Sequence, residues 1–158
     1  MTDFDDCALL IRTLQQALPE LQIEGGYSEP FYRAPRNGAP GCLQFRYDFQ
    51  RSLLHEIAHY CLAGDQRRRL DDFGYWYAAE GRTANEQAAF ETAEVRPQAL
   101  EWMFCDCLGL PFSPSRDDFS ERPDDGSFLM RIQMARETLA SALPPTAARV
   151  LRALQTCG

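Results

Sequence analysis

Residues 52–64 read SLLHEIAHYCLAG, and this stretch contains both histidines of the chain, His55 and His59. Their spacing of four residues puts both imidazoles on one face of an α-helix, about one turn apart, so that both can bind one metal ion. Glu56 lies roughly 100° further round the helix, at the edge of that face. The HExxH pattern predicts a metal-binding helix, although an amphipathic helix without a metal could contain the same five residues.

The flanks of the pentapeptide predict a buried helix. It is expected to begin near Asp48 or Ser52 and to end at Gly64, because glycine readily takes the left-handed conformation that follows a helix. Its back is apolar over a wide arc made by Leu53, Leu54, Ile57, Tyr60 and Cys61. Two buried imidazoles without polar partners would be unfavourable, whereas a metal ion satisfies one nitrogen of each. Burial therefore favours the metal hypothesis.

The composition is that of a globular protein of one domain. The 158 residues are 45% hydrophobic and 25% charged, which is ordinary for a chain that buries its own core. No apolar run approaches the roughly 18 residues of a membrane span, and the acidic N-terminus does not resemble an export signal. We therefore expect a cytoplasmic protein with reduced cysteines that does not bind a membrane.

The charge of the chain bears on its partners. A net charge of −7 argues against general nucleic-acid binding, which depends on Lys and Arg side chains that neutralise phosphates. The run Arg67-Arg68-Arg69 is a local exception just after the histidine helix. It indicates either a solvated turn or a contact with an acidic partner protein.

Hydrophobic periodicity predicts further elements on both sides of the histidine helix. In chain order they are a helix over about 4–18, one or two short strands within 21–41, a half-buried strand over 43–47, and two amphipathic helices over about 127–142 and 145–156. The fold class that follows is α+β and helix-rich, with a small sheet. Nothing in the outer segments suggests chemistry.

The stretch 71–77, Asp-Asp-Phe-Gly-Tyr-Trp-Tyr, is dense in aromatic residues. Aromatic residues favour strands and glycine permits close backbone approach, so the stretch predicts a strand or an extended lip. It can be a core strand filled with aromatic side chains. It can also be the wall of a pocket, in which Tyr75 and Tyr77 face one side and Asp72 supplies charge.

A second helix is predicted to start at Thr83, because Thr83 and Glu86 have the spacing of a capping box. Pro97 falls inside this helix and should kink or restart it just after Glu94. Gly109 is expected to end the helix.

Two histidines on one helix leave a metal ion undercoordinated, and a carboxylate on the second helix is the simplest third ligand. Glu91, Glu94 and Gln98 form a polar stripe, in which Glu94 is our first choice and Glu91 the alternative. Such a ligand set suits zinc with a hydrolytic water or Fe(II) that binds oxygen. Glu56 would be the general base in the first case, and an acid, base or orienting residue beside the metal in the second.

These motifs together are specific to one family. They are the stretches 52–64, 68–70, 72–77, 81–82, 90–91, 94–95 and 97–100. In this pattern the chain resembles the bacterial elongation factor P hydroxylase family over about residues 50–112. The resemblance implies one metal-dependent hydroxylase domain over residues 1–158, with a zincin-like central helix, a second helix that supplies a ligand and a small sheet. It implies a monooxygenase that hydroxylates the β-lysylated lysine of elongation factor P.

Carried over residue by residue, the resemblance makes His55, His59 and Glu94 the metal ligands. Glu56, beside them, is our candidate catalytic residue. It implies a divalent metal, which we interpret as Fe(II), and O2 as co-substrate. We do not assign 2-oxoglutarate, because the HxD…H pattern of the common 2-oxoglutarate hydroxylases is missing. A long cationic side chain suits an acidic pocket walled by aromatic rings. The expected substrate contacts are Asp72, Tyr75, Tyr77, Glu91 and Gln98.

Two alternatives to a hydroxylase are open at this point. A small HExxH zinc metalloprotease would use Glu56 as its base and would lose peptide cleavage, but not metal, on Glu56→Gln. A binding module stabilised by structural zinc would need a fourth ligand such as Cys105 or Cys107. Cys61 is a poor candidate, because it points about 200° away from His59 on the same helix.

Overall fold

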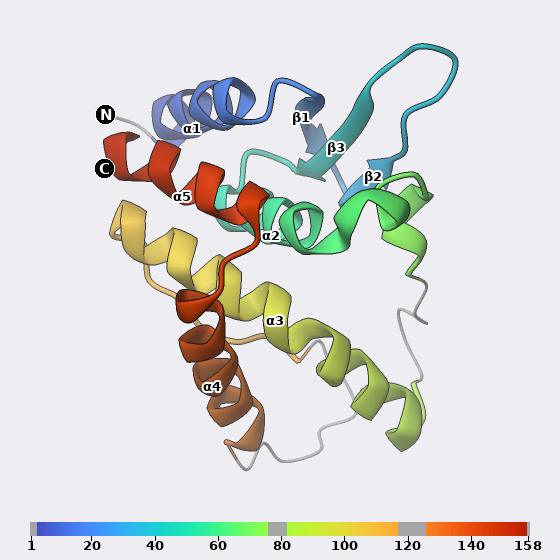
Figure 1. Cartoon of the computed structure of the whole chain (residues 1–158), viewed down its shortest axis with the longest axis vertical. Coiled ribbons are helices and arrows are strands. Elements are labelled where there is room, and N and C mark those ends of the chain that lie inside the picture. Colours follow the sequence, from blue (N-terminus) through green and yellow to red (C-terminus); the bar gives the residue numbers. More distant parts are fainter. Residues whose placement is uncertain (1–2, 76–81, 117–125, 158) are drawn as a thin grey trace.

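The computed structural model describes residues 3–75, 82–116 and 126–157 (Figure 1). In chain order the elements are α1 (Asp3–Ala17), β1 (Leu21–Tyr27), β2 (Phe31–Arg33), β3 (Gly41–Arg46), α2 (Gln50–Arg67), a 3₁₀ turn (Asp71–Gly74), α3 (Ala84–Leu108), α4 (Ser127–Ser141) and α5 (Pro145–Cys157). The predicted helix-rich α+β class with a small sheet is confirmed. No helix in the described ranges is long and apolar enough to cross a membrane.

The sheet has three strands in the order β1-β3-β2. β1 is parallel to β3, with Ile23 opposite Leu43, whereas β2 is antiparallel to β3. β3 is buried along most of its length rather than half-buried, because α2 packs on it. The predicted extension of this strand to Tyr47 is wrong: β3 ends at Arg46, and Tyr47 has a φ of 48°.

Helix α2 lies in the middle of the molecule, between the sheet and α3, while α1 packs beside α5 (Figure 1). The five apolar residues predicted to form its back are each at most 4% exposed, which confirms the buried helix. Gly64 has a φ of 77° and a ψ of 171°, a conformation essentially restricted to glycine, so the regular helix ends there as predicted. One further turn reaches Arg67.

The arginine run at the end of α2 fits the predicted solvated turn at Arg67 and Arg69, which are exposed, whereas Arg68 is partly buried and has a structural role. The Arg68 guanidinium donates hydrogen bonds to the carbonyl oxygens of Tyr60 at 2.9 Å and Cys61 at 3.3 Å, and to Thr146 Oγ1 on α5 at 3.2 Å. Arg67 donates to the carbonyl oxygen of Phe73 at 3.1 Å. These bonds satisfy carbonyl groups at the helix end and fix the following turn.

The predicted strand over 71–77 is also wrong where the structure describes it. Residues 71–74 form a 3₁₀ turn in which Asp72 and Phe73 have φ values of 49° and 58°. Phe73 is 3% exposed and stacks on Tyr32 of β2 at a centroid distance of 4.2 Å, so tertiary packing turns the chain inward. Tyr77 lies outside the described residues.

The capping box at the start of α3 is confirmed. Thr83 Oγ1 accepts from the Glu86 N–H at 3.1 Å, and the Glu86 carboxylate accepts from the Thr83 N–H at 3.0 Å. The predicted restart near Pro97 is wrong, because α3 is continuous to Leu108, and this helix packs against α2, α4 and α5. Gly109 ends the helix in the left-handed conformation, as predicted.

Candidate metal centre

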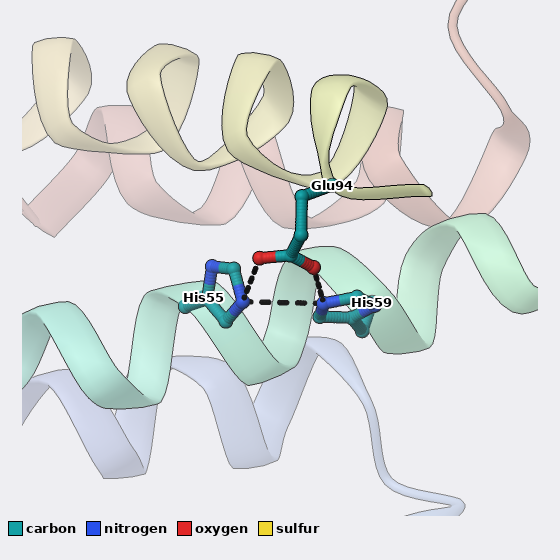
Figure 2. A group of neighbouring side chains, drawn as sticks. All are labelled: His55, His59 and Glu94. Atoms are coloured by element: carbon teal, nitrogen blue, oxygen red, sulfur yellow. Dashed lines mark hydrogen bonds and ion pairs between the residues drawn. The ribbon is translucent and has the colours of Figure 1, made fainter. Parts of the chain in front are cut away.

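Helices α2 and α3 bring three potential ligands to one point (Figure 2). His59 Nε2 lies 2.8 Å from one carboxylate oxygen of Glu94, and His55 Nε2 lies 3.2 Å from the other. The two Nε2 atoms are 3.1 Å apart. Two imidazole nitrogens and a carboxylate that converge in this way fit the donor set of a divalent metal such as Zn²⁺ or Fe(II). The structure thus brings together the three residues predicted as ligands.

Burial and charge make the protonation of His55, His59 and Glu94 depend on one another. Glu94 is 8% exposed, and burial alone would raise its pKa, but the imidazoles of His55 and His59 hold the pKa of its carboxyl well below the ordinary value. Burial alone would lower the pKa of His55, yet Glu94 and Glu101 raise it well above its ordinary value. A metal ion that binds here must therefore displace a proton from the imidazole.

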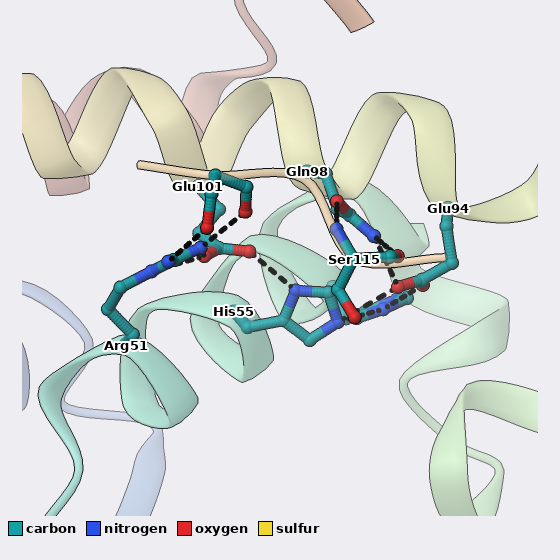
Figure 3. Close-up of polar contacts among 8 residues, drawn as sticks. Arg51, His55, Glu94, Gln98, Glu101 and Ser115 are labelled. Carbon is teal, nitrogen blue, oxygen red and sulfur yellow. Dashed lines mark hydrogen bonds and ion pairs between the residues drawn. The ribbon is translucent and has the colours of Figure 1, made fainter. Parts of the chain in front are cut away.

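Glu101 is a member of the site that the sequence reasoning missed. Its Oε1 lies 2.8 Å from His55 Nδ1, and its Oε2 accepts from Arg51 Nε at 3.1 Å and Nη2 at 2.6 Å (Figure 3). Paired with Arg51, the carboxylate can only accept, so His55 Nδ1 donates to it and Nε2 is the ring nitrogen that would lose its proton to a metal ion. Glu101 follows Glu94 by seven residues, on the same face of the helix, and that spacing could have identified it.

Gln98 occupies the space between these two glutamates. Its side-chain N–H donates to Glu94 Oε1 at 3.2 Å and to the carbonyl oxygen of Ser115 at 2.7 Å. Its own carbonyl oxygen accepts from the Ser115 N–H at 2.9 Å. The amide is 2% exposed and is held at both ends, so it fixes the orientation of the Glu94 carboxylate.

Two adjoining cavities meet at the ligands. One, of about 360 Å³, is lined by Asp72 and Tyr75 in addition to the three ligands. The other, of about 690 Å³, reaches His55 and Glu94 from the side of Phe49 and Ser115. Asp72 Oδ1 accepts from the Tyr32 N–H at 2.9 Å, and burial raises the pKa of its carboxyl. The smaller cavity thus combines carboxylates with aromatic rings.

Glu56 lines both cavities beside the ligands. Burial raises the pKa of its carboxyl above the ordinary value. Within the ranges that the structure describes, no hydrogen bond to this carboxyl is found. The group is therefore available to a substrate or to water at the metal.

The remaining predicted substrate contacts lie in different places. Tyr75 is 37% exposed at the edge of the smaller cavity, with its ring centroid 6.3 Å from that of His59. Glu91 is bonded to Arg116 at 2.9 Å, and in the described part of the chain the potential ligand group contains Glu94 rather than Glu91. Tyr77 is outside the described residues.

The cysteines do not contribute to this ligand group among the described residues. Burial raises the pKa of Cys61 to about 12, and burial followed by the charge of Glu101 raises the pKa of Cys105 to about 11. The geometry gives no support to a structural zinc site with a cysteine ligand.

Two comparisons with known proteins bear on this site. The sequence model of the family described as Elongation factor P hydroxylase matches residues 11–157. A protein of Haemophilus influenzae named "Elongation factor P lysine hydroxylase" is 42% identical over 104 residues, which are 65% of this chain and 58% of the relative. The matched part thus spans less than two thirds of that relative's length. Since the family match extends over most of the chain and includes all three potential ligands, the chain belongs to the elongation factor P hydroxylase family.

Proposed function

We propose that this protein is a cytoplasmic, metal-dependent monooxygenase that hydroxylates the β-lysylated lysine of elongation factor P. The observation that supports it most is the convergence of His55, His59 and Glu94 at cavities lined by carboxylates and aromatic rings, in a chain of this family. A 2-His-1-carboxylate set leaves coordination positions open, as non-haem Fe(II) oxygenases require.

We propose Fe(II) as the metal, with His55 Nε2, His59 Nε2 and one Glu94 oxygen as its protein ligands. Bound there, it would supply the redox chemistry that activates O2, which zinc cannot do. In the net reaction one oxygen atom enters a C–H bond, and the other becomes water with two electrons from an external donor and two protons. We do not assign 2-oxoglutarate as that donor.

The residues around the ligands would bind the substrate. A long cationic side chain would enter the smaller cavity, where Asp72 supplies negative charge and Tyr75 an aromatic wall. Tyr77, Glu91 and Gln98 stay predicted contacts; Gln98 would act through its bond to Glu94. Glu56, whose pKa is raised by burial, would hold or release a proton at its carboxyl oxygen beside the reacting groups.

The test is a mass measurement on the proposed substrate. The Fe(II)-loaded protein is incubated with β-lysylated elongation factor P, O2 and a reductant. We expect a mass increase of one oxygen atom, which is lost in His55→Ala, His59→Ala and Glu94→Ala. Asp106→Asn is a matched control, because Asp106 is another carboxylate on α3 that pairs with an arginine, Arg136, at the surface. An unchanged mass with the wild-type protein would refute the proposal.

The same samples discriminate against the protease alternative. A zinc protease would cleave elongation factor P or a casein substrate, and Glu56→Gln would abolish cleavage while the metal stays bound. We expect no cleavage product from either the zinc-loaded or the iron-loaded protein.

A further inference from the structure

Arg46 at the end of β3 and Phe49 just before α2 line the larger cavity, and Tyr47 lies between them in the sequence. We call Arg46, Tyr47 and Phe49 the aromatic rim. Tyr47 is 46% exposed and Phe49 is 50% exposed, and their rings meet edge to face at a centroid distance of 5.4 Å. Arg46 and Phe49 line the same cavity as His55 and Glu94, so the rim is continuous with the candidate metal centre.

Tyr47 and Phe49 both occupy backbone positions at which other residue types would be more stable. Tyr47 has a φ of 48°, which is unfavourable for a bulky residue, and its backbone is held there by hydrogen bonds with Gly26 and Tyr27 at 2.8 and 2.9 Å. Phe49 is the N-cap residue of α2, where Ser, Thr, Asp or Asn would bond the first turn, and it makes no such bond. Two neighbouring departures from local preference, both with exposed aromatic rings, point to a role outside the fold.

Arg46 adds a charge to this surface. Its guanidinium carbon lies 5.6 Å from the centroid of the Tyr47 ring and 6.0 Å from that of Phe49. Within the described residues its side chain has no hydrogen bond or ion pair, whereas Arg51, Arg116 and Arg136 each pair with a carboxylate. In a chain of net charge −7, the rim thus presents a cation that two rings hold in place.

We propose that the aromatic rim is the docking surface for the loop of the protein substrate that presents the target lysine. The inference rests on the proposed function. The charges are complementary to one kind of loop: Glu56 and Asp72 inside the cavities attract its cationic side chain, while Arg46 outside binds a carboxylate close to that lysine. Tyr47 and Phe49 cover apolar side chains of the loop, as exposed aromatic residues do at the centre of interfaces.

The chain offers a matched control for this surface. Met130 and Met134 on α4 are 63% and 66% exposed, more than either rim aromatic, and neither lines the cavities at the ligands. The rim variants are Tyr47→Ala, Phe49→Ser and Arg46→Glu, and the control is the double variant Met130→Ala/Met134→Ala. Phe49→Ser introduces a favourable N-cap side chain, so it should fold at least as stably as the wild type.

The experiment measures binding and turnover separately. The affinity of the iron-loaded enzyme for β-lysylated elongation factor P is determined by calorimetry without O2, and KM and kcat come from the mass assay. Each rim variant should weaken binding and raise KM by about tenfold or more, with kcat within about twofold of the wild type. The effect of Arg46→Glu should shrink at high salt. The methionine double variant should behave like the wild type.

The outcomes separate this inference from the proposed function. Folded rim variants that bind the factor as tightly as the wild type would overturn the docking surface, even if hydroxylation is observed. An equal loss of binding in the methionine control would overturn it as well. If the wild type binds the factor through the rim but never changes its mass, the docking surface stands and the hydroxylase proposal fails. If the wild type neither binds nor modifies the factor, both fail.

Discussion

Replacing Glu101 with alanine should weaken metal binding, although Glu101 is not among the three potential ligands. The substitution removes the 2.8 Å hydrogen bond to His55 Nδ1 and leaves Arg51 without its carboxylate. Both imidazole tautomers of His55 then become accessible, and one of them has a proton on Nε2, where the metal would bind. Loss of such an outer partner lowers metal affinity by about 10–100-fold, or about 1.4–2.8 kcal/mol. This range agrees with about 1.5–3 kcal/mol for one hydrogen bond to a charged group.

Two assays measure this effect. Competition with a coloured chelator gives the affinity for Co(II) or Fe(II) in Glu101→Ala, Glu101→Gln and the wild type. Since the chain contains two histidines, ¹⁵N-histidine labelling of the zinc-loaded protein yields signals from two rings only. We expect a protonated, slowly exchanging Nδ1 on His55 in the wild type and rapid exchange in Glu101→Ala. Glu101→Gln retains an acceptor oxygen, so its loss of affinity should be smaller.

Asp106→Asn is the control for both assays. Asp106 is on the same helix, and its carboxylate pairs with Arg136 rather than with a ligand, so its replacement should leave metal affinity and the His55 signals unchanged. Wild-type affinity and an unchanged Nδ1–H signal in Glu101→Ala would refute the reasoning. So would an equal loss of affinity in Asp106→Asn, because it would indicate a general effect of charge on α3.

Three further predictions concern protonation and stability. For the metal-free protein, the raised pKa of His55 contributes stability below about pH 6.5 that is lost as pH rises through the folded-state value, and the lowered pKa of Glu94 contributes stability above about pH 4.5 that is lost on acidification. Thermal melts should therefore show the added stability from His55 and Glu94 between about pH 4.5 and about pH 6.5. The apparent metal affinity should rise with pH, because the metal displaces protons from its ligands. A metal affinity independent of pH would contradict this. Cys61 and Cys105 should react with iodoacetamide at pH 8 at least about 100-fold more slowly than glutathione, as mass spectrometry would detect, because few thiolates form at pKa values of about 12 and about 11. Thr83→Ala should destabilise the protein by about 1 kcal/mol and lower its Tm by about 2–4 °C, and an unchanged Tm would mean that the first turn of α3 frays before global unfolding.

Much of the metal centre could be predicted from spacing alone. The four-residue interval between His55 and His59 fixes their common face on α2, and the stripe on the second helix includes Glu94. These inferences depend only on helical geometry, which is the same in every protein. The capping box at Thr83 and the end of α3 at Gly109 were predictable for the same reason.

The errors concern segments whose conformation depends on distant partners. Aromatic residues favoured a strand at 71–74, but the stacking of Phe73 on Tyr32 outweighs that local preference. The role of Arg68 inside the fold was not foreseen, because its partner Thr146 is 78 positions away in the sequence. Pro97 was expected to interrupt α3, yet the packing of this helix on three others maintains it. The cavities follow from these contacts, so the sequence could not define their shape.

The segment after α3 shows how two ligands come to depend on one short piece of backbone. The carbonyl oxygen of Ser113 accepts a hydrogen bond from Arg51, which pairs with Glu101, and Glu101 in turn orients His55. The peptide groups of Ser115 hold the side chain of Gln98, which orients Glu94. The bonds that Ser113 and Ser115 make to Arg51 and Gln98 use main-chain atoms of the segment, except a weak one at the Ser113 hydroxyl. Related proteins could therefore differ in every side chain of this segment and keep the same support. A proline at position 115 is the exception, since it lacks the N–H that donates a hydrogen bond to the Gln98 side-chain oxygen.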